Sequence, residues 1–243
     1  MILCVAASPS VDKLFEVGRV EIGAIHRPDG FVQVPGGKGL NVARAAHGLG
    51  AEVIATGILA GHAGRWIEEA LAAEGARGQF AWVDGETRAS LSVADASGRG
   101  LTEFYEKGWD IGPGGWDRLE RIVREALPAA GWMTISANLP VGAPDDGYAR
   151  LVAMAREVGV PVALDARDEA LLLGVSAGPQ VVKVNAEEAT RPPGTGRRSG
   201  ASRGQRRIAS PPGPPSASPA GRPPPRWPGP WRAARASPWS RTP

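Results

Sequence analysis

A glycine-rich stretch places the tightest limit on how this chain can fold. Residues 35–39 read Pro-Gly-Gly-Lys-Gly. Three glycines in four residues do not suit a helix interior, where each glycine costs about 1 kcal/mol relative to alanine. From residue 40 onward the sequence takes a helical period, with one apolar face made of Leu40, Ala43, Ala46 and Leu49. The pattern therefore predicts a tight turn that leads into the N-terminus of a helix.

This turn has the properties of an anion-binding loop. Bare glycine backbone lets a ligand approach closely, and the free N–H groups at a helix N-terminus favour negative charge. Lys38 adds a positive charge, and Asn41 adds an amide that can both donate and accept hydrogen bonds. The residues alone leave a purely structural turn as an equal alternative. Their spacing fits neither the Walker pattern nor Gly-x-Gly-x-x-Gly.

The order of apolar segments predicts an α/β fold. Residues 1–7 form a continuous apolar run, the pattern of a strand buried on both faces. Further strands are expected over residues 52–58, 132–136, 160–164 and 181–185, and they alternate with helices expected over residues 40–50, 65–74, 115–127, 145–158 and 166–173. Residues 61–64 are expected to form a loop. This alternation indicates a parallel sheet covered by helices.

Polar side chains occur where the expected strands end. They are Ser8, Asp12, Ser136, Asp165 and Asn185, and we expect them to line one crevice at the carboxyl edge of the sheet. Asp12 is expected in the loop after the first strand. A capping or turn-forming role for this residue is an equally good interpretation of the sequence.

A second, smaller sheet is predicted from short alternating segments. They cover residues 14–17, 20–22, 31–34, 89–93 and 101–105, and a hairpin turn joins the last two. Arg88 stands at the start of one of them. An arginine there has two interpretations, an ordinary solvated side chain or, beside an anion site, a planar clamp for phosphate.

The charge of the chain is divided between two unlike parts. The whole chain carries a formal charge of +3, yet residues 190–243 contain 11 arginines and no lysine, aspartate or glutamate. Residues 1–189 are therefore acidic. The tail also holds 14 of the 23 prolines and one branched aliphatic residue, Ile208, so we expect it to be disordered. Its Trp and Arg content leaves nucleic-acid binding as a weaker alternative, while an out-of-frame reading of a GC-rich gene explains the composition better.

The cysteine content and the hydropathy of the sequence bear on where in the cell the protein is located. Cys4 is the only cysteine, so no disulfide can form within the chain, and we expect a cytoplasmic location. No apolar run approaches the roughly 18 residues of a membrane helix, so no membrane association is expected.

Five motifs, in this order, carry a family resemblance. They are Ser8-Pro9-x-x-Asp12, Gly36-Gly37-Lys38-Gly39-x-Asn41-x-Ala43, Glu86-Thr87-Arg88, Ser136-x-x-Leu139-Pro140 and Lys183-x-Asn185-x-x-Glu188. Over residues 1–188 the sequence closely resembles the PfkB (ribokinase) family of carbohydrate kinases, in particular the 1-phosphofructokinase and tagatose-6-phosphate kinase group. The resemblance implies a ribokinase-like three-layer αβα sandwich with a small β-sheet lid. The lid strands would lie within residues 12–34 and 88–105.

The same resemblance implies a phosphotransferase reaction and a set of site residues. The reaction would be ATP- and Mg²⁺-dependent phosphorylation of a sugar phosphate, fructose 1-phosphate to fructose 1,6-bisphosphate, with tagatose 6-phosphate or fructose 6-phosphate as alternative substrates. Substrate would be bound by Asp12, Gly37, Lys38, Asn41, Arg88 and Ser136, nucleotide by Lys183 and Asn185, and Mg²⁺ indirectly by Glu188. The lid would pair two chains in a homodimer.

One departure from the family concerns the end of the chain. Relatives continue for about another hundred residues, which include a Gly-Ala-Gly-Asp motif with the catalytic Asp base. Nothing after Glu188 matches this motif, so no catalytic base is assigned. We expect residues 1–189 to be the N-terminal part of the kinase domain, residues 190–243 to follow a frameshift, and the fold to be incomplete at its C-terminus. Such a chain would be inactive, and a non-catalytic sugar-phosphate-binding remnant is the alternative from another functional class.

Overall fold

The computed structural model describes residues 1–184, and its largest element is a six-stranded sheet. All its strands are parallel, in the order β10-β9-β8-β1-β4-β5. The strands are β1 (Ile2–Ala6), β4 (Val53–Ala60), β5 (Arg77–Val83), β8 (Trp132–Ser136), β9 (Val162–Asp165) and β10 (Val181–Val182). The first apolar run of the chain is therefore a central strand, which explains why it has no polar face.

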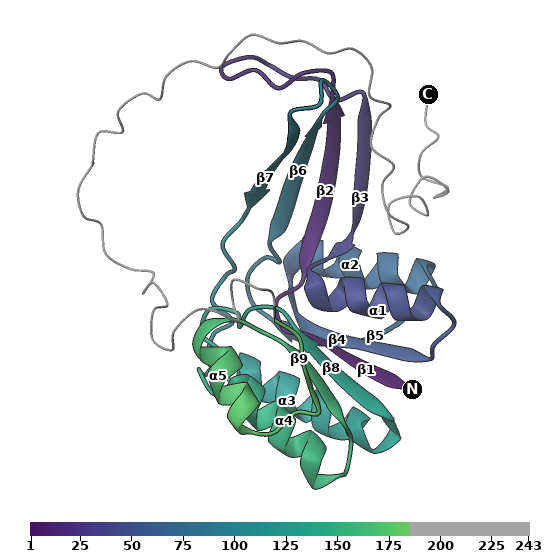
Figure 1. Ribbon diagram of the computed structural model, residues 1–243, viewed down its shortest axis with the longest axis vertical. Coiled ribbons are helices and arrows are strands. Elements are labelled where there is room, and N and C mark those ends of the chain that lie inside the picture. The colour runs from purple at the N-terminus through teal and green to yellow at the C-terminus, as the bar shows by residue number, and fades with distance from the viewer. Residues whose placement is uncertain (185–243) are drawn as a thin grey trace, which may run out of the picture.

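Helices cover both faces of this sheet (Figure 1). One face carries α1 (Lys38–Gly48) and α2 (Gly61–Ala73), and the other carries α3 (Gly115–Ala126), α4 (Gly147–Glu157) and α5 (Asp168–Ser176). A 3-10 turn, η1 (Leu127–Ala129), follows α3. A hydrophobic core lies on each face of the sheet, and alternate residues of β1 point into one or the other. Leu3 and Val5 belong to the core that includes α3 and α4, whereas Cys4 and Ala6 belong to the core that includes α1.

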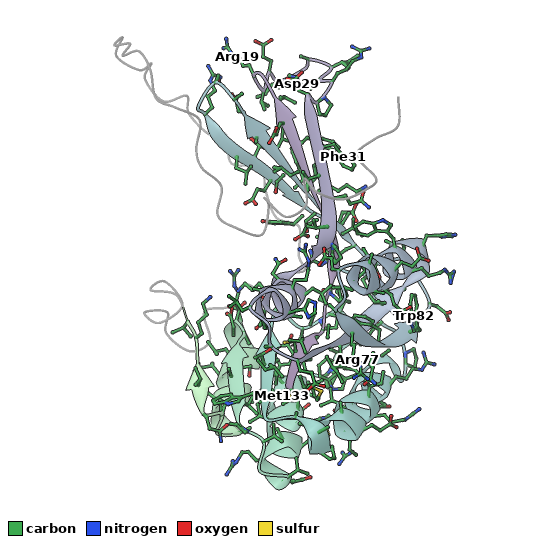
Figure 2. The ribbon with its side chains drawn as sticks, turned by 90° about the vertical axis from the view of Figure 1, so that its right-hand side faces the viewer. Arg19, Asp29, Phe31, Arg77, Trp82 and Met133 are labelled. Atoms are coloured by element: carbon green, nitrogen blue, oxygen red, sulfur yellow. The ribbon has the colours of Figure 1, made fainter. Side chains whose placement is uncertain are left out.

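The second sheet forms a lid that stands away from the main layer (Figure 1). Its strands are β2 (Ser10–Val17), β3 (Gly30–Gly36), β6 (Ala89–Asp95) and β7 (Gly100–Tyr105), in the order β3-β2-β6-β7. The central β2–β6 pair is parallel, and the two outer pairs are antiparallel. Figure 2 shows Phe31 on the lid and Met133 within the main layer. The prediction of a three-layer αβα sandwich with a small β-sheet lid is confirmed.

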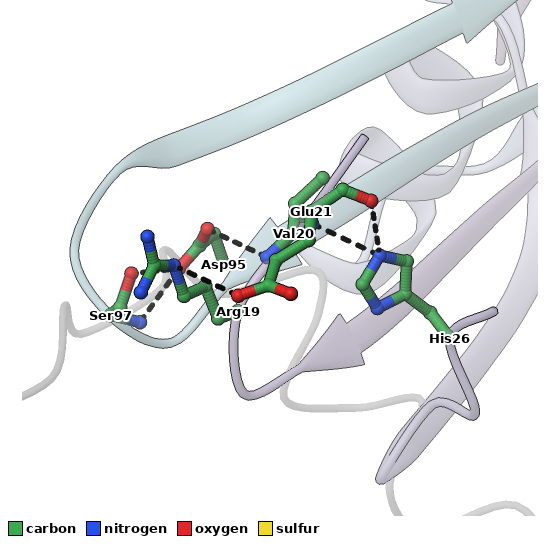
Figure 3. A network of polar contacts seen from close by, with 6 residues as sticks. All are labelled: Arg19, Val20, Glu21, His26, Asp95 and Ser97. Carbon is green, nitrogen blue, oxygen red and sulfur yellow. Dashed lines mark hydrogen bonds and ion pairs between the residues drawn. The ribbon is translucent and has the colours of Figure 1, made fainter. Parts of the chain in front are cut away.

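Asp95 fastens the far end of the lid (Figure 3). Its carboxylate accepts hydrogen bonds from the backbone N–H of Ser97 at 2.8 Å and of Val20 at 3.0 Å, and from the Ser97 hydroxyl. These bonds, that of the Ser97 hydroxyl first, lower the pKa of Asp95. Beside it, Glu21 N–H donates to Nε2 of His26 at 3.0 Å, and Arg19 lies 3.5 Å from the Glu21 carboxylate. The long β2–β3 loop is thereby tied to the end of β6.

The structure corrects two expectations about local elements and adds one strand that was not predicted. No strand forms over residues 20–22. Residues 61–64 are not a loop, because α2 begins at Gly61, directly after β4. Strand β5 was not predicted: Arg77 and its two neighbours are exposed at the sheet edge, so the segment lacks a continuous apolar run. Among residues 1–184, no helix has the length and apolar character needed to cross a bilayer.

Candidate functional site

The glycine-rich turn lies at the carboxyl edge of the main sheet and is held by Asp12. The Asp12 carboxylate accepts hydrogen bonds from Gly37 N–H at 3.2 Å and from the Ser10 hydroxyl at 2.6 Å. Gly37 has φ of 85°, a conformation that favours glycine, and directly precedes α1. A Cβ on Gly36 would lie 2.0 Å from Cγ of Asp12. The turn therefore needs glycine in order to approach the carboxylate.

Asp12 is not in a loop, contrary to the sequence-based expectation. It is the third residue of β2, and it pairs with Val34 of β3 and Ser90 of β6. The chain leaves β1 through residues 7–9 and enters the lid strand at once. Asp12 consequently stands at the root of the lid, where the lid meets the turn.

Arg88 lies at the same root. Its guanidinium donates to the Ser8 hydroxyl from Nε, to the Ser8 carbonyl from Nη2 and to the Ser90 hydroxyl from Nη1, each at 3.3 Å. All three acceptors are neutral, and among residues 1–184 Arg88 makes no ion pair. Burial lowers the pKa of Arg88, although the charge of Asp12 opposes this shift. The side chain is thus a partly buried cation that makes no ion pair in the described part of the chain.

The Lys38 side chain links the glycine-rich turn to the end of β9. Its Nζ lies 3.4 Å from Oδ1 of Asp165, the last residue of β9, and Lys183 Nζ lies 3.2 Å from Oδ2 of the same carboxylate. The Asp165 side chain is 15% exposed, whereas the two lysines are 40% and 64% exposed. Asp165 therefore joins a residue predicted to bind substrate to one predicted to bind nucleotide. The sequence placed Asp165 at the crevice but assigned no role to it.

The two remaining substrate-binding candidates keep free polar groups. Asn41 is exposed on the first turn of α1, and its side-chain amide makes no hydrogen bond within the described residues. Ser136 ends β8 and is buried, with its hydroxyl likewise unpaired in residues 1–184. Both groups are therefore available to a ligand.

The turn after Ser136 is strained and firmly held. Ala137 has φ of 143°, which favours glycine, and its N–H donates to the Asp165 carbonyl at 3.1 Å. The buried Tyr148 hydroxyl shares its single proton between the carbonyls of Ala137 and Asn138, at 3.2 and 3.1 Å. Burial raises the pKa of Tyr148. These bonds fix the chain where it passes the site.

The structure thus brings Asp12, Gly37 and Arg88 together at the root of the lid and links Lys38 to Lys183 through Asp165. Asn185 and Glu188 lie outside the described residues. Within residues 1–184, no three His, Cys, Asp or Glu side chains converge as metal ligands. The carboxylate of Asp165 already faces two lysines, so this part of the chain does not by itself form a Mg²⁺ site.

Comparisons with known proteins agree with this architecture. A model of the pfkB family of carbohydrate kinases matches residues 8–195. A Thermotoga maritima structure described as "Possible 1-phosphofructokinase" superposes with a TM-score of 0.71 at 27% identity, over 75% of this chain and 59% of that one. Phosphofructokinase-2 from Escherichia coli in complex with fructose-6-phosphate gives a TM-score of 0.72 at 26% identity, over 77% and 62% of the two chains. The chain thus spans about three fifths of the length of these relatives.

Proposed function

The chain belongs to the pfkB family of carbohydrate kinases, and from that premise we propose that residues 1–184 form the phosphosugar-binding part of an ATP-dependent kinase. The proposed substrate is fructose 1-phosphate, which the complete kinase would convert to fructose 1,6-bisphosphate. The supporting site consists of Asp12, Gly37, Lys38, Asn41, Arg88 and Ser136, which lie along the carboxyl edge of the main sheet and the root of the lid.

Arg88 carries this proposal. A guanidinium can bind two phosphate oxygens at once, and this interaction is stronger where water is excluded. Arg88 is partly buried, bonds to neutral oxygens of Ser8 and Ser90, and has no ion-pair partner among the described residues. A partly buried guanidinium that bonds only to neutral oxygens gains from an anion that joins it. The phosphate of a phosphosugar would supply that anion.

Asp12 suits the hydroxyl groups at the other end of such a substrate. Its carboxylate accepts two hydrogen bonds in the structure, and an ionised carboxylate can accept about four. Gly37 N–H and Lys38 at the start of α1 add positive potential next to it. The site therefore offers the Asp12 carboxylate as an acceptor for hydroxyls and the Arg88 guanidinium as a donor for phosphate.

ATP and Mg²⁺ are proposed for the complete kinase. Lys183 would contact nucleotide from its place beside Asp165, and Asn185 and Glu188 would complete that side from outside the described residues. Phosphoryl transfer requires a positioned nucleophile and charge stabilisation. The Gly-Ala-Gly-Asp segment that supplies these in relatives does not occur in the sequence. We propose that the 243-residue chain alone binds phosphosugar without transferring phosphate.

Fructose 6-phosphate is a second candidate substrate. It is favoured by the superposition on Escherichia coli phosphofructokinase-2 in complex with fructose-6-phosphate. Tagatose 6-phosphate stays a third option from the resemblance. Side-by-side calorimetric titrations with the three compounds rank them, and tighter binding of either 6-phosphate would replace fructose 1-phosphate in the proposal.

The decisive experiment compares Arg88→Ala with a matched control. Arg121→Ala removes an exposed arginine of α3, far from the lid root. In calorimetric titrations with fructose 1-phosphate, we expect Arg88→Ala to weaken binding by at least about tenfold and Arg121→Ala to leave it unchanged. Equal binding by Arg88→Ala and the unaltered chain would overturn the proposal.

Three further proposals complete the assignment. We propose that the lid pairs two chains, because Phe31, Phe104 and Tyr105 are 58%, 59% and 64% exposed on it. Light scattering of the purified chain tests this, since a monomer at all concentrations would contradict it. We also propose a cytoplasmic location. Finally, we propose that the kinase domain ends near residue 189 and that residues 190–243 are read out of frame, which resequencing of the gene would test.

A further inference from the structure

We propose that Thr87 and Glu86 are positioning residues for Arg88, which they hold at the junction of the two sheets. Neither residue was assigned a role from the sequence, where the motif Glu86-Thr87-Arg88 stood out for its arginine. Each makes contacts with the main layer that would be unnecessary if residue 88 were an ordinary surface arginine.

Thr87 is locked onto the last residue of β4. Its hydroxyl accepts a hydrogen bond from Ala60 N–H at 2.9 Å and donates to the Ala60 carbonyl at 3.0 Å. Its own backbone N–H donates to that carbonyl at 3.1 Å. The Thr87 side chain is buried. Three bonds to one residue fix both the side chain and the backbone at position 87.

Glu86 makes a second attachment, at the start of α2. Its carboxylate accepts hydrogen bonds from the backbone N–H groups of Ala63 at 2.5 Å and His62 at 3.2 Å. The residue that precedes α2 is Ala60, which has no side chain that could cap these groups. The bond from Ala63 is the main reason that the pKa of Glu86 is lowered. The carboxylate thus takes the place of the missing cap.

Residue 88 is the point where the chain passes from the main layer to the lid. Thr87 is bonded to β4, whereas the Arg88 carbonyl accepts a hydrogen bond from Val11 N–H of β2 at 2.9 Å. Ala89 then begins β6. The Arg88 backbone is therefore held from both sides, and its guanidinium turns toward Ser8.

The guanidinium contacts have little tolerance for movement. All three are 3.3 Å long, near the outer limit for a hydrogen bond, so a small shift of the backbone at residue 88 would break them. Thr87 and Glu86 act on them through the backbone, because neither side chain bonds to the guanidinium. The consequence for ligand binding rests on the proposed function, in which Arg88 binds the phosphate of the substrate.

Nuclear magnetic resonance of the full 243-residue chain tests the positioning without any ligand. The Nε–H signal of Arg88, identified by its loss in Arg88→Lys, reports whether the guanidinium stays bonded to Ser8. We expect a displaced, slowly exchanging signal in the unaltered chain and in Thr87→Ser, which keeps the hydroxyl. In Thr87→Val the signal should move to the position of exposed arginines. Glu86→Gln should shift it part of the way.

Two outcomes of the NMR experiment would overturn the inference. A failure of the proposed function would appear in the ligand titration instead. An unchanged Arg88 signal in a folded Thr87→Val chain would refute the role of Thr87. If Thr87→Val does not fold, an unchanged Arg88 signal in Glu86→Gln refutes the proposal that these residues position Arg88. Titration with fructose 1-phosphate is the second readout, with binding expected to weaken about tenfold in Thr87→Val. Absence of binding by the unaltered chain would reject the phosphosugar proposal, while the Arg88 signal still decides the positioning role.

Discussion

The two ends of the candidate site are built very differently. At the lid root, Asp12 of β2 accepts a hydrogen bond from Gly37, and Arg88 donates to Ser8. The residues before Arg88 bond to β4 and to α2. At the other end, Lys38 and Lys183 meet the carboxylate of Asp165, and Lys183 follows the two-residue strand β10. Within residues 1–184 the first end is held by several hydrogen bonds, whereas the second rests on partly exposed ion pairs. We propose that the lid-root end binds phosphosugar and that this end does not depend on the Asp165 end.

The largest effect is expected from filling the space between the turn and Asp12. In Gly36→Ala the new Cβ would lie 2.0 Å from Cγ of Asp12, so the carboxylate must leave the turn. We expect loss of measurable fructose 1-phosphate binding in calorimetry and destabilisation of about 1–3 kcal/mol in urea unfolding. Gly48→Ala is the matched control, since nothing lies within 4 Å of its added Cβ. If both variants bind alike, the contact between the turn and Asp12 is not needed for binding.

A smaller effect, of opposite sign, is expected at the strained turn after β8. Ala137→Gly relieves a backbone conformation that disfavours alanine, so we expect stabilisation of about 1 kcal/mol in urea unfolding. The control Ala153→Gly, on the exposed side of α4, should instead destabilise by about 1 kcal/mol. Destabilisation by both changes would mean that residue 137 is not under strain.

Removal of the shared carboxylate should have a modest effect on stability. Asp165→Asn leaves Lys38 and Lys183 without their common partner, and both lysines are partly exposed to solvent. We expect a loss of about 0.5–1 kcal/mol at low salt that shrinks in 1 M NaCl. Urea unfolding at the two salt concentrations measures it. A loss of several kcal/mol would show that the Asp165 end is as firmly built as the lid root.

The smallest effect concerns acid stability at the start of α2. The folded-state pKa of Glu86 is lowered below its ordinary value of 4.5, chiefly by the hydrogen bond from Ala63. Its stabilising contribution is therefore present above pH 4.5 and is lost as the pH falls through the folded-state pKa. Thermal melts from pH 6 to pH 3 should show a shallower decline for Glu86→Gln than for the unaltered chain. Parallel curves would contradict this.

The sequence predicted the elements that have a clear local pattern and missed those fixed by tertiary contacts. Strand β1, the α1 turn and the β6–β7 hairpin follow directly from local patterns. Strand β5 was not predicted because its first three residues are exposed and interrupt the apolar pattern of a buried strand. The start of α2 at Gly61 was not predicted because Glu86, which is distant in the sequence, caps it. Asp12 looked like a loop residue, since nothing local shows that β2 begins at Ser10.

The candidate site was predictable only in part, for the same reason. The motifs predicted which side chains bind substrate, and this stays a prediction. The structure shows that three of them, Asp12, Gly37 and Arg88, lie together at the lid root. The supports were not predictable: Thr87 bonds to Ala60 across 27 positions, and Asp165 reaches Lys38 across 127 positions. Such pairings depend on sheet order, which no local pattern contains.

The contrast between the two ends is tested most directly by titrating one sample of the 243-residue chain with fructose 1-phosphate and another with a non-hydrolysable ATP analogue and Mg²⁺. The account predicts saturable binding of fructose 1-phosphate without nucleotide, and no binding of the analogue. Binding of the analogue together with no heat from fructose 1-phosphate would contradict it, because the nucleotide end would then be the half that stands alone.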